Sequence, residues 1–180
     1  MILTYKQCIK KYGSDYNIKK MMESGKLYQQ EKGIYSDKQF CSMLDVITAK
    51  YPQAVFSGRS AYYYHGLTDE IPEKYYISTK RSATRIKNDK IKQSFVNDDI
   101  YDFGIKTIKY QGSVIHIYSK ERLLIDLIRF RAKYPMDFYK GVIKAYRQIT
   151  EELDYYDIEE YAEHFSNREN IIWAIQMEVL

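Results

Sequence analysis

The chain has 180 residues, of which 45% are hydrophobic and 29% are charged, and its formal net charge is +4. This length suits one ordinary domain or a small module followed by a larger one, and no stretch approaches the roughly 20 apolar residues of a membrane span. The first residues turn polar too early for a secretory leader, and the 2 cysteines are too few for a disulfide framework. We therefore expect a reduced, cytoplasmic protein that does not contact a membrane.

The charge is distributed unevenly along the chain. Residues 1–36 hold seven lysines against three acidic residues, and residues 74–92 hold seven basic residues against one acidic residue. Residues 150–180 hold nine acidic residues and one arginine. This asymmetry favours a basic surface that binds a polyanion, although the 74–92 run also fits an ordinary solvated loop.

The first 36 residues predict two short helices and a small hairpin. Apolar residues at helical spacing predict a helix over 2–12, with Thr4 as a candidate N-cap and Gly13 as its end. Ser14 is a candidate cap for a second helix that stops at Gly25, and the segments 26–30 and 33–36 then form a hairpin. Two helices joined by a tight turn and followed by a hairpin are typical of a winged helix-turn-helix.

The middle of the chain predicts a helix and then mostly strands. Phe40, Met43, Leu44 and Ile47 form an apolar stripe, which predicts a helix from Ser36–Asp37 to residue 50. Short strands are expected at 54–57, 74–79 and 92–96, with a short helix at 59–65 and a basic loop at 80–90. The segments 105–110 and 113–118 form a hairpin around a two-residue turn.

The last third predicts helices. Ser119 is expected to cap a largely buried helix over 120–131, and three further helices follow around residues 138–149, 158–165 and 171–179. The predicted fold class is therefore α+β: a small N-terminal winged helix-turn-helix, then a mixed domain that ends in a helical bundle.

Four stretches, read together and in order, resemble one family. They are residues 13–36 (GSDYNIKKMMESGKLYQQEKGIYS), 54–67 (AVFSGRSAYYYHGL), 71–74 (IPEK) and 117–128 (IYSKERLLIDLI). They are similar to the AbiEi antitoxins of bacterial abortive-infection systems, over roughly residues 4–149. The acidic tail beyond residue 150 carries no part of this resemblance.

The resemblance implies a winged helix-turn-helix DNA-binding unit over 1–36, with the predicted helix at 37–50 as a candidate to complete it, and an antitoxin domain over 37–180. Such proteins bind inverted repeats of double-stranded DNA in their own promoter and repress the operon. They also counteract a nucleotidyltransferase-like toxin, in a type IV toxin–antitoxin arrangement used in phage defence, without a stable complex. A monomer or weak dimer that binds DNA cooperatively, without cofactor or metal and without enzymatic activity, is the corresponding expectation.

In this reading the second predicted helix is the recognition helix. Its N-terminal residues would enter the major groove, where Asn17 could pair bidentately with adenine. The other candidate contacts to bases and phosphates lie on the same helix and in the hairpin. The predicted DNA-binding set is Ser14, Tyr16, Asn17, Lys19, Lys20, Lys26 and Lys32.

The basic run forms a second candidate track along the DNA backbone. Its members are Lys80, Arg81, Arg85, Lys87, Lys90 and Lys92, and each phosphate they neutralise would steepen the salt dependence of binding.

No catalytic or metal-binding pattern stands out. Ser57, His65 and Asp69 have no nucleophile elbow, and His65 is expected to be satisfied locally at a helix end. Asp126 is expected to pair with Arg122 and Arg129, one helical turn away on either side. An alternative function is a protein-interaction module in which the winged unit does not read DNA; the acidic tail and the tyrosine-rich segments motivate it.

Overall fold

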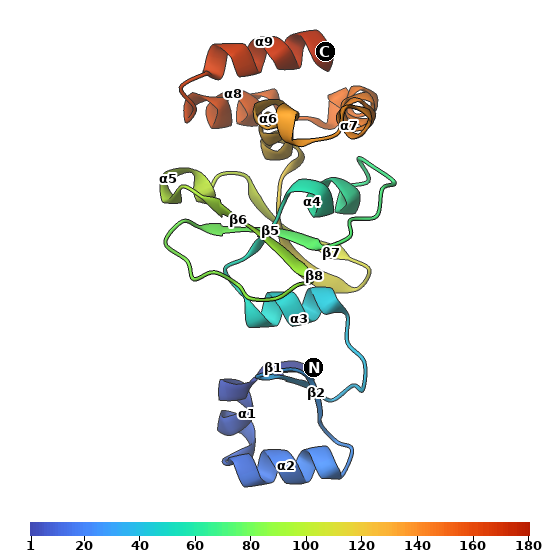
Figure 1. The fold of residues 1–180 in the computed structure, drawn as a ribbon, viewed down its shortest axis with the longest axis vertical. Helices are drawn as coiled ribbons and strands as arrows, with labels where there is room; N and C mark the ends of the chain where they lie inside the picture. Colours follow the sequence, from blue (N-terminus) through green and yellow to red (C-terminus); the bar gives the residue numbers. More distant parts are fainter. The chain divides into compact units, whose positions relative to one another are not determined.

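The computed structural model describes all residues from Met1 to Leu180. The fold is α+β, as the sequence predicts, and it contains two separate β-sheets (Figure 1). The chain divides into two compact units, Met1–Ala54 with Ile108–Ile115, and Val55–Thr107 with His116–Leu180. None of the helices is both long and apolar enough to cross a membrane.

The first unit surrounds a small three-stranded sheet. Strand β1 (Ile2–Thr4) comes first, then helices α1 (Tyr5–Tyr12) and α2 (Asp15–Glu23), and then strands β2 (Tyr28–Glu31) and β3 (Ile34–Ser36). Both neighbours of β3 are antiparallel to it, which gives the order β1-β3-β2. Helix α3 (Met43–Lys50) contacts β1 and β3. The small apolar core of the unit is made by Leu3, Cys8, Ile18, Leu27 and Tyr35.

Side-chain caps fix both helices at the start of this unit. Thr4 accepts a hydrogen bond from the backbone N–H of Gln7, whose side chain accepts in return from the backbone N–H of Thr4, a complete capping box. Ser14 caps α2 by accepting from the N–H of Asn17. The caps agree with the sequence, but the prediction of helix over residues 2–4 is wrong, because these residues pair with 34–36 in the sheet.

The predicted helical start at Ser36–Asp37 is also wrong. The helix begins at Met43, capped by Ser42, and Phe40 is 83% exposed rather than part of a buried stripe. The side chain of Gln30 holds the intervening segment, since it donates to the carbonyl of Lys38 and accepts from the N–H of Cys41. The thiol of Cys41 makes a polar contact there, since it lies 3.0 Å from the hydroxyl of Ser36.

The second sheet has five strands in the order β6-β5-β4-β8-β7. They are β4 (Val55–Phe56), β5 (Tyr75–Lys80), β6 (Ile91–Val96), β7 (Ile105–Tyr110) and β8 (Ser113–Tyr118). Strand β4 is antiparallel to β5 and parallel to β8, and β5 is parallel to β6 with Ser78 opposite Ser94. The hairpin β7–β8 closes through Gln111 and Gly112, both with positive φ (47° and 87°), which is the backbone of a tight two-residue turn.

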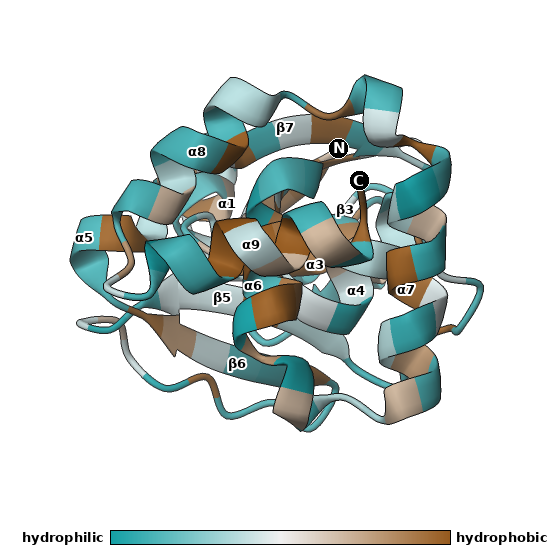
Figure 2. Cartoon of the chain, turned by 90° about the horizontal axis from the view of Figure 1, so that it is seen from above, coloured by the Kyte–Doolittle hydropathy of each residue, from teal (hydrophilic) through white to brown (hydrophobic).

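The helices of the second unit are α4 (Gly58–Tyr64), α5 (Asp98–Tyr101), α6 (Lys120–Arg129), α7 (Met136–Gln148), α8 (Tyr155–Glu163) and α9 (Arg168–Glu178). Sequence patterns predicted all of these except α5, which is too short to show a period. Helix α6 starts at Ser119, whose hydroxyl accepts from the N–H of Arg122, and it packs against α4, α8 and α9. Figure 2 shows both hydrophobic and hydrophilic residues on α7, as expected of a helix with one buried face.

Candidate functional site

The predicted recognition residues lie on the exposed side of α2. Tyr16 is 74% exposed, and Lys19 and Lys20 are also exposed, while Ile18 of the same helix is buried in the core. Ser14 uses its hydroxyl as the helix cap. The side-chain nitrogen of Asn17 donates to the carbonyl of Tyr12 at 2.7 Å, so a bidentate contact to adenine would require this bond to break.

The lysines within residues 1–36 keep their charge free. Lys26 precedes β2 and Lys32 lies in the turn of the hairpin, and both are exposed. None of the seven lysines in residues 1–36 makes a salt bridge. Two of the three acidic residues there have partners outside these seven lysines: Asp15 accepts from the Tyr5 hydroxyl, and Glu31 pairs with Lys50. The positive charge is therefore available to an external anion.

The second predicted track is less uniform than the sequence suggests. Lys80 pairs with Asp102 at 2.9 Å, and the backbone N–H of Arg81 donates to the Asp98 carboxylate. Asp102 partly compensates the positive charge of Lys80, so Lys80 attracts a phosphate less strongly than a free lysine would. The remaining members are exposed and make no salt bridge: Arg85, Lys87, Lys90 and Lys92.

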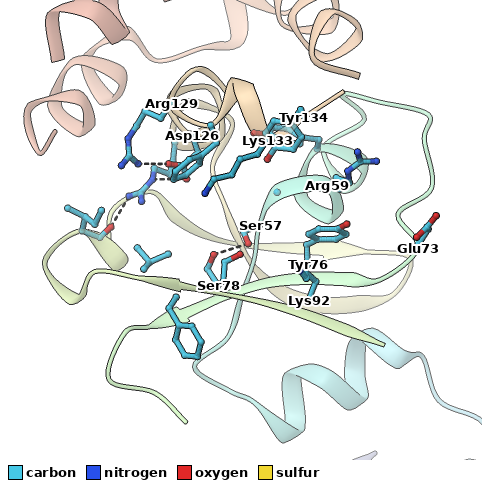
Figure 3. A pocket seen from close by; sticks show the side chains of 18 of the residues that line it. Ser57, Arg59, Glu73, Tyr76, Ser78, Lys92, Asp126, Arg129, Lys133 and Tyr134 are labelled. Atoms are coloured by element: carbon cyan, nitrogen blue, oxygen red, sulfur yellow. Dashed lines mark hydrogen bonds and ion pairs between the residues drawn. The ribbon is translucent and has the colours of Figure 1, made fainter. Parts of the chain in front are cut away.

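Lys92 differs from the rest of the run because it lines a cavity that the sequence did not predict. The cavity has a volume of about 710 Å³ and is bounded by β5, β6 and the residue after β4 on one side and by α4, α6 and residues 130–134 on the other (Figure 3). All of its lining residues lie in the second unit.

Serine hydroxyls form the sheet side of this cavity. Ser78 of β5 donates to Ser57, the residue after β4, at 2.8 Å, and Ser94 lies opposite Ser78 on β6. Residues two apart on a strand share a face, so Tyr76 and Lys92 stand beside these serines. A sheet face covered by helices is normally apolar, so this polar patch indicates a site rather than a packing surface.

Charged groups converge on the opposite side. Asp126 accepts from Arg122 Nε at 3.2 Å and from Arg129 Nη1 at 3.0 Å, which confirms the predicted local salt bridges. One carboxylate thus serves two guanidinium groups. Burial lowers the pKa of Arg129, and Asp126 opposes that shift, so the arginine stays charged. Lys133, which carries no carboxylate partner, reaches into the cavity and lies 4.1 Å from the Phe130 ring (Figure 3).

The imagined Ser–His–Asp arrangement does not form. His65 Nε2 lies 2.8 Å from the carbonyl of Tyr118, so the ring proton is on Nε2. Burial lowers the pKa of this imidazole and keeps it neutral. The ring is satisfied at the end of α4, as expected, although its partner is 53 residues away rather than local. No group of three or more His, Cys, Asp or Glu side chains in the chain could hold a metal ion.

Comparison with known proteins gives a fold neighbour and no family. No protein-family model and no curated protein matches the chain. Its fold is similar to the crystal structure of the RV2827C protein from Mycobacterium tuberculosis, with a TM-score of 0.61 and 14% sequence identity. The match covers 91% of this chain but 66% of that protein, so the chain spans just under two thirds of its neighbour's length. At this identity the likeness concerns the fold alone.

Proposed function

We propose that the chain is a DNA-binding antitoxin and autorepressor of its own operon, and that residues 1–36, completed by α3, act as a winged helix-turn-helix. The resemblance of four sequence stretches to AbiEi antitoxins supports the antitoxin role and the nucleotidyltransferase-like toxin as its functional partner. No enzymatic step is part of this proposal.

The order of elements supports the winged reading. In the proposed unit α1 and α2 are separated only by Gly13 and Ser14, α2 is the recognition helix and the β2–β3 hairpin is the wing. Such units usually have a further helix before the wing. Helix α3, which follows the hairpin in the chain, contacts β1 and β3 and supplies the apolar cover that this further helix would otherwise give.

One observation carries the DNA-binding role: the exposed face of α2 and the hairpin present lysines that no acidic residue neutralises. Phosphate contacts by lysine release counterions and supply most of the sequence-independent affinity for DNA. Tyr16 and Asn17 lie at the N-terminal end of the same helix, and the side-chain oxygen of Asn17 accepts no hydrogen bond. This is the end that reads bases in helix-turn-helix proteins.

The test is fluorescence anisotropy of the full chain with the duplex upstream of its own gene, against a scrambled duplex, across a salt series. The plot of log affinity against log salt has a negative slope, and Lys19→Ala with Lys20→Ala should reduce its magnitude by about 1.8, because each phosphate contact contributes about 0.9. The matched control is Lys109→Ala with Lys144→Ala, which removes the same charge from two exposed lysines of β7 and α7. Equal slopes for the two double variants would refute the assignment of α2.

The antitoxin role needs a separate test. Co-expression with a neighbouring nucleotidyltransferase-like gene should restore growth that the toxin alone arrests. Rescue should persist in the Lys19→Ala, Lys20→Ala variant if the second unit carries this activity. Growth arrest that the intact chain does not relieve would contradict the antitoxin role.

A second candidate function is favoured by the surface of α9. Trp173 and Met177 are 64% and 65% exposed and lie one helical turn apart, in a region rich in acidic residues. An exposed aromatic next to a methionine is typical of protein contacts. A protein-interaction module, in which the winged unit does not read DNA, predicts that Trp173→Ala abolishes rescue and that the intact chain binds its upstream duplex and a scrambled duplex equally.

A further inference from the structure

The cavity of the second unit has an excess of positive charge. Arg59 is paired with Glu70, and Arg122 and Arg129 share the single carboxylate of Asp126. Lys92 and Lys133 have no carboxylate partner. The lining therefore holds five cationic side chains against three acidic ones, the third being Glu73, which lies at the far end of the cavity from Arg129 (Figure 3).

Hydroxyl donors face the same space as these cations. The Ser57 hydroxyl accepts from Ser78 and donates to no other group of the chain, so its own proton remains available as a donor. Ser94 makes no hydrogen bond with its hydroxyl, and it lies next to Ser78 across the β5–β6 pair. Ammonium groups combined with serine hydroxyls form the donor set that phosphate oxygens accept from.

The remaining wall is aromatic. The ring of Tyr76 and the hydroxyl of Tyr134 both approach Gly58, where an added Cβ would lie 3.7 Å and 3.8 Å from them. Tyr134 is stacked on Phe138, with ring centroids 5.3 Å apart, so its ring is held in place. The volume of about 710 Å³ exceeds what a bare phosphate ion fills and is in the range of small-molecule sites.

We propose that this cavity binds a small organic phosphate monoester with a planar body. Its phosphate lies between Lys92, Lys133 and the serine hydroxyls, and its body lies against Tyr76 and Tyr134. This site is independent of the DNA-binding role proposed for the first unit, since every residue that lines it belongs to the second.

The test is isothermal titration of the full chain with phenyl phosphate, inorganic phosphate and phenol as probes. Phenyl phosphate should bind at least tenfold more tightly than inorganic phosphate, and phenol should give no saturable binding. Equal affinity for phenyl phosphate and inorganic phosphate would overturn the proposal, because the aromatic wall would then contribute nothing. Absence of binding by all three probes at millimolar concentration would overturn it as well.

Variants locate the site. Lys92→Ala with Lys133→Ala should weaken phenyl phosphate binding at least tenfold, and Ser78→Ala should weaken it several-fold. Lys109→Ala with Lys144→Ala should leave it unchanged. Both lysines of the first pair are exposed, so their loss should leave the fold intact, as far-ultraviolet circular dichroism would verify. If the Lys92, Lys133 variant loses DNA affinity while phenyl phosphate does not bind the intact chain, the cavity belongs to a nucleic-acid surface and the proposal is wrong.

Discussion

Gly104 offers a sharp test of the packing in the second unit. Its φ of +71° is in the left-handed region, and its carbonyl accepts from the N–H of Ser119 at 2.6 Å, just before α6. A Cβ added here would lie 2.6 Å from the Cβ of Arg122 and 3.3 Å from the Ser119 hydroxyl. The Arg122 Cβ is attached directly to the helix backbone, so it cannot turn aside. Alanine at this position therefore meets both strain and a clash.

Gly66 provides the matched control because it has the same φ of +71° but nothing within 4 Å of an added Cβ. Gly66→Ala should cost only the left-handed backbone penalty, about 1 kcal/mol. Gly104→Ala adds an overpacking cost of about 2 kcal/mol, for a total near 3 kcal/mol. At this chain length each kcal/mol lowers Tm by about 2–4 °C, so the expected losses are about 3 °C and 9 °C respectively.

The assay is thermal and urea denaturation of the intact chain and both variants, followed by circular dichroism. Because the two glycines share a φ value, the difference between the variants measures the clash with Arg122. If the unfolding free energies of Gly104→Ala and Gly66→Ala agree within about 0.5 kcal/mol, the predicted clash with Arg122 is refuted, since an overpacking cost would exceed this difference.

Three further predictions concern single side chains. Burial lowers the pKa of His65 below its ordinary 6.5, so in acid the unfolded chain binds a proton that the folded chain does not. The stability of the fold should therefore decrease as pH drops below 6.5. A melting series from pH 7.5 to 5 should show a smaller decrease for His65→Gln than for the unmodified chain. Tyr62→Phe should cost about 1 kcal/mol in urea denaturation, because the buried hydroxyl donates to the Leu123 carbonyl at 3.0 Å. Thr4→Ala should cost about 1 kcal/mol by the same assay through loss of the capping box, and Thr4→Ser should not.

The parts of the fold that depend on local sequence were predictable. Caps and turns act within a few residues, which is why Thr4, Ser14 and Ser119 could be assigned from the chain alone. Strand β1 could not be, because Ile2–Thr4 is extended only through pairing with residues 34–36. The prediction of a helix over residues 37–42 is wrong for a similar reason. Gln30, several residues earlier in the chain, supplies the hydrogen bonds that a helix would otherwise make.

The cavity shows a different limit of sequence reasoning. A signal exists, since Tyr76 and Ser78 lie two residues apart, as do Lys92 and Ser94. Polar residues at a period of two mark one face of a strand. The sequence does not reveal that β5 and β6 pair in parallel register, nor that Ser57 joins them from β4. The sequence therefore indicates only a linear basic run, whereas in the fold Lys92 lines the cavity beside serines and Arg85 does not line it.

The contrast between the two cysteines has a practical consequence. Cys8 is fully buried and burial raises the pKa of its thiol, whereas Cys41 is partly exposed. A maleimide dye should therefore attach to Cys41 alone in the unmodified chain. Since the N–H of Cys41 bonds to Gln30 of β2, that fluorophore would lie beside the hairpin and would report the duplex binding that we propose for it.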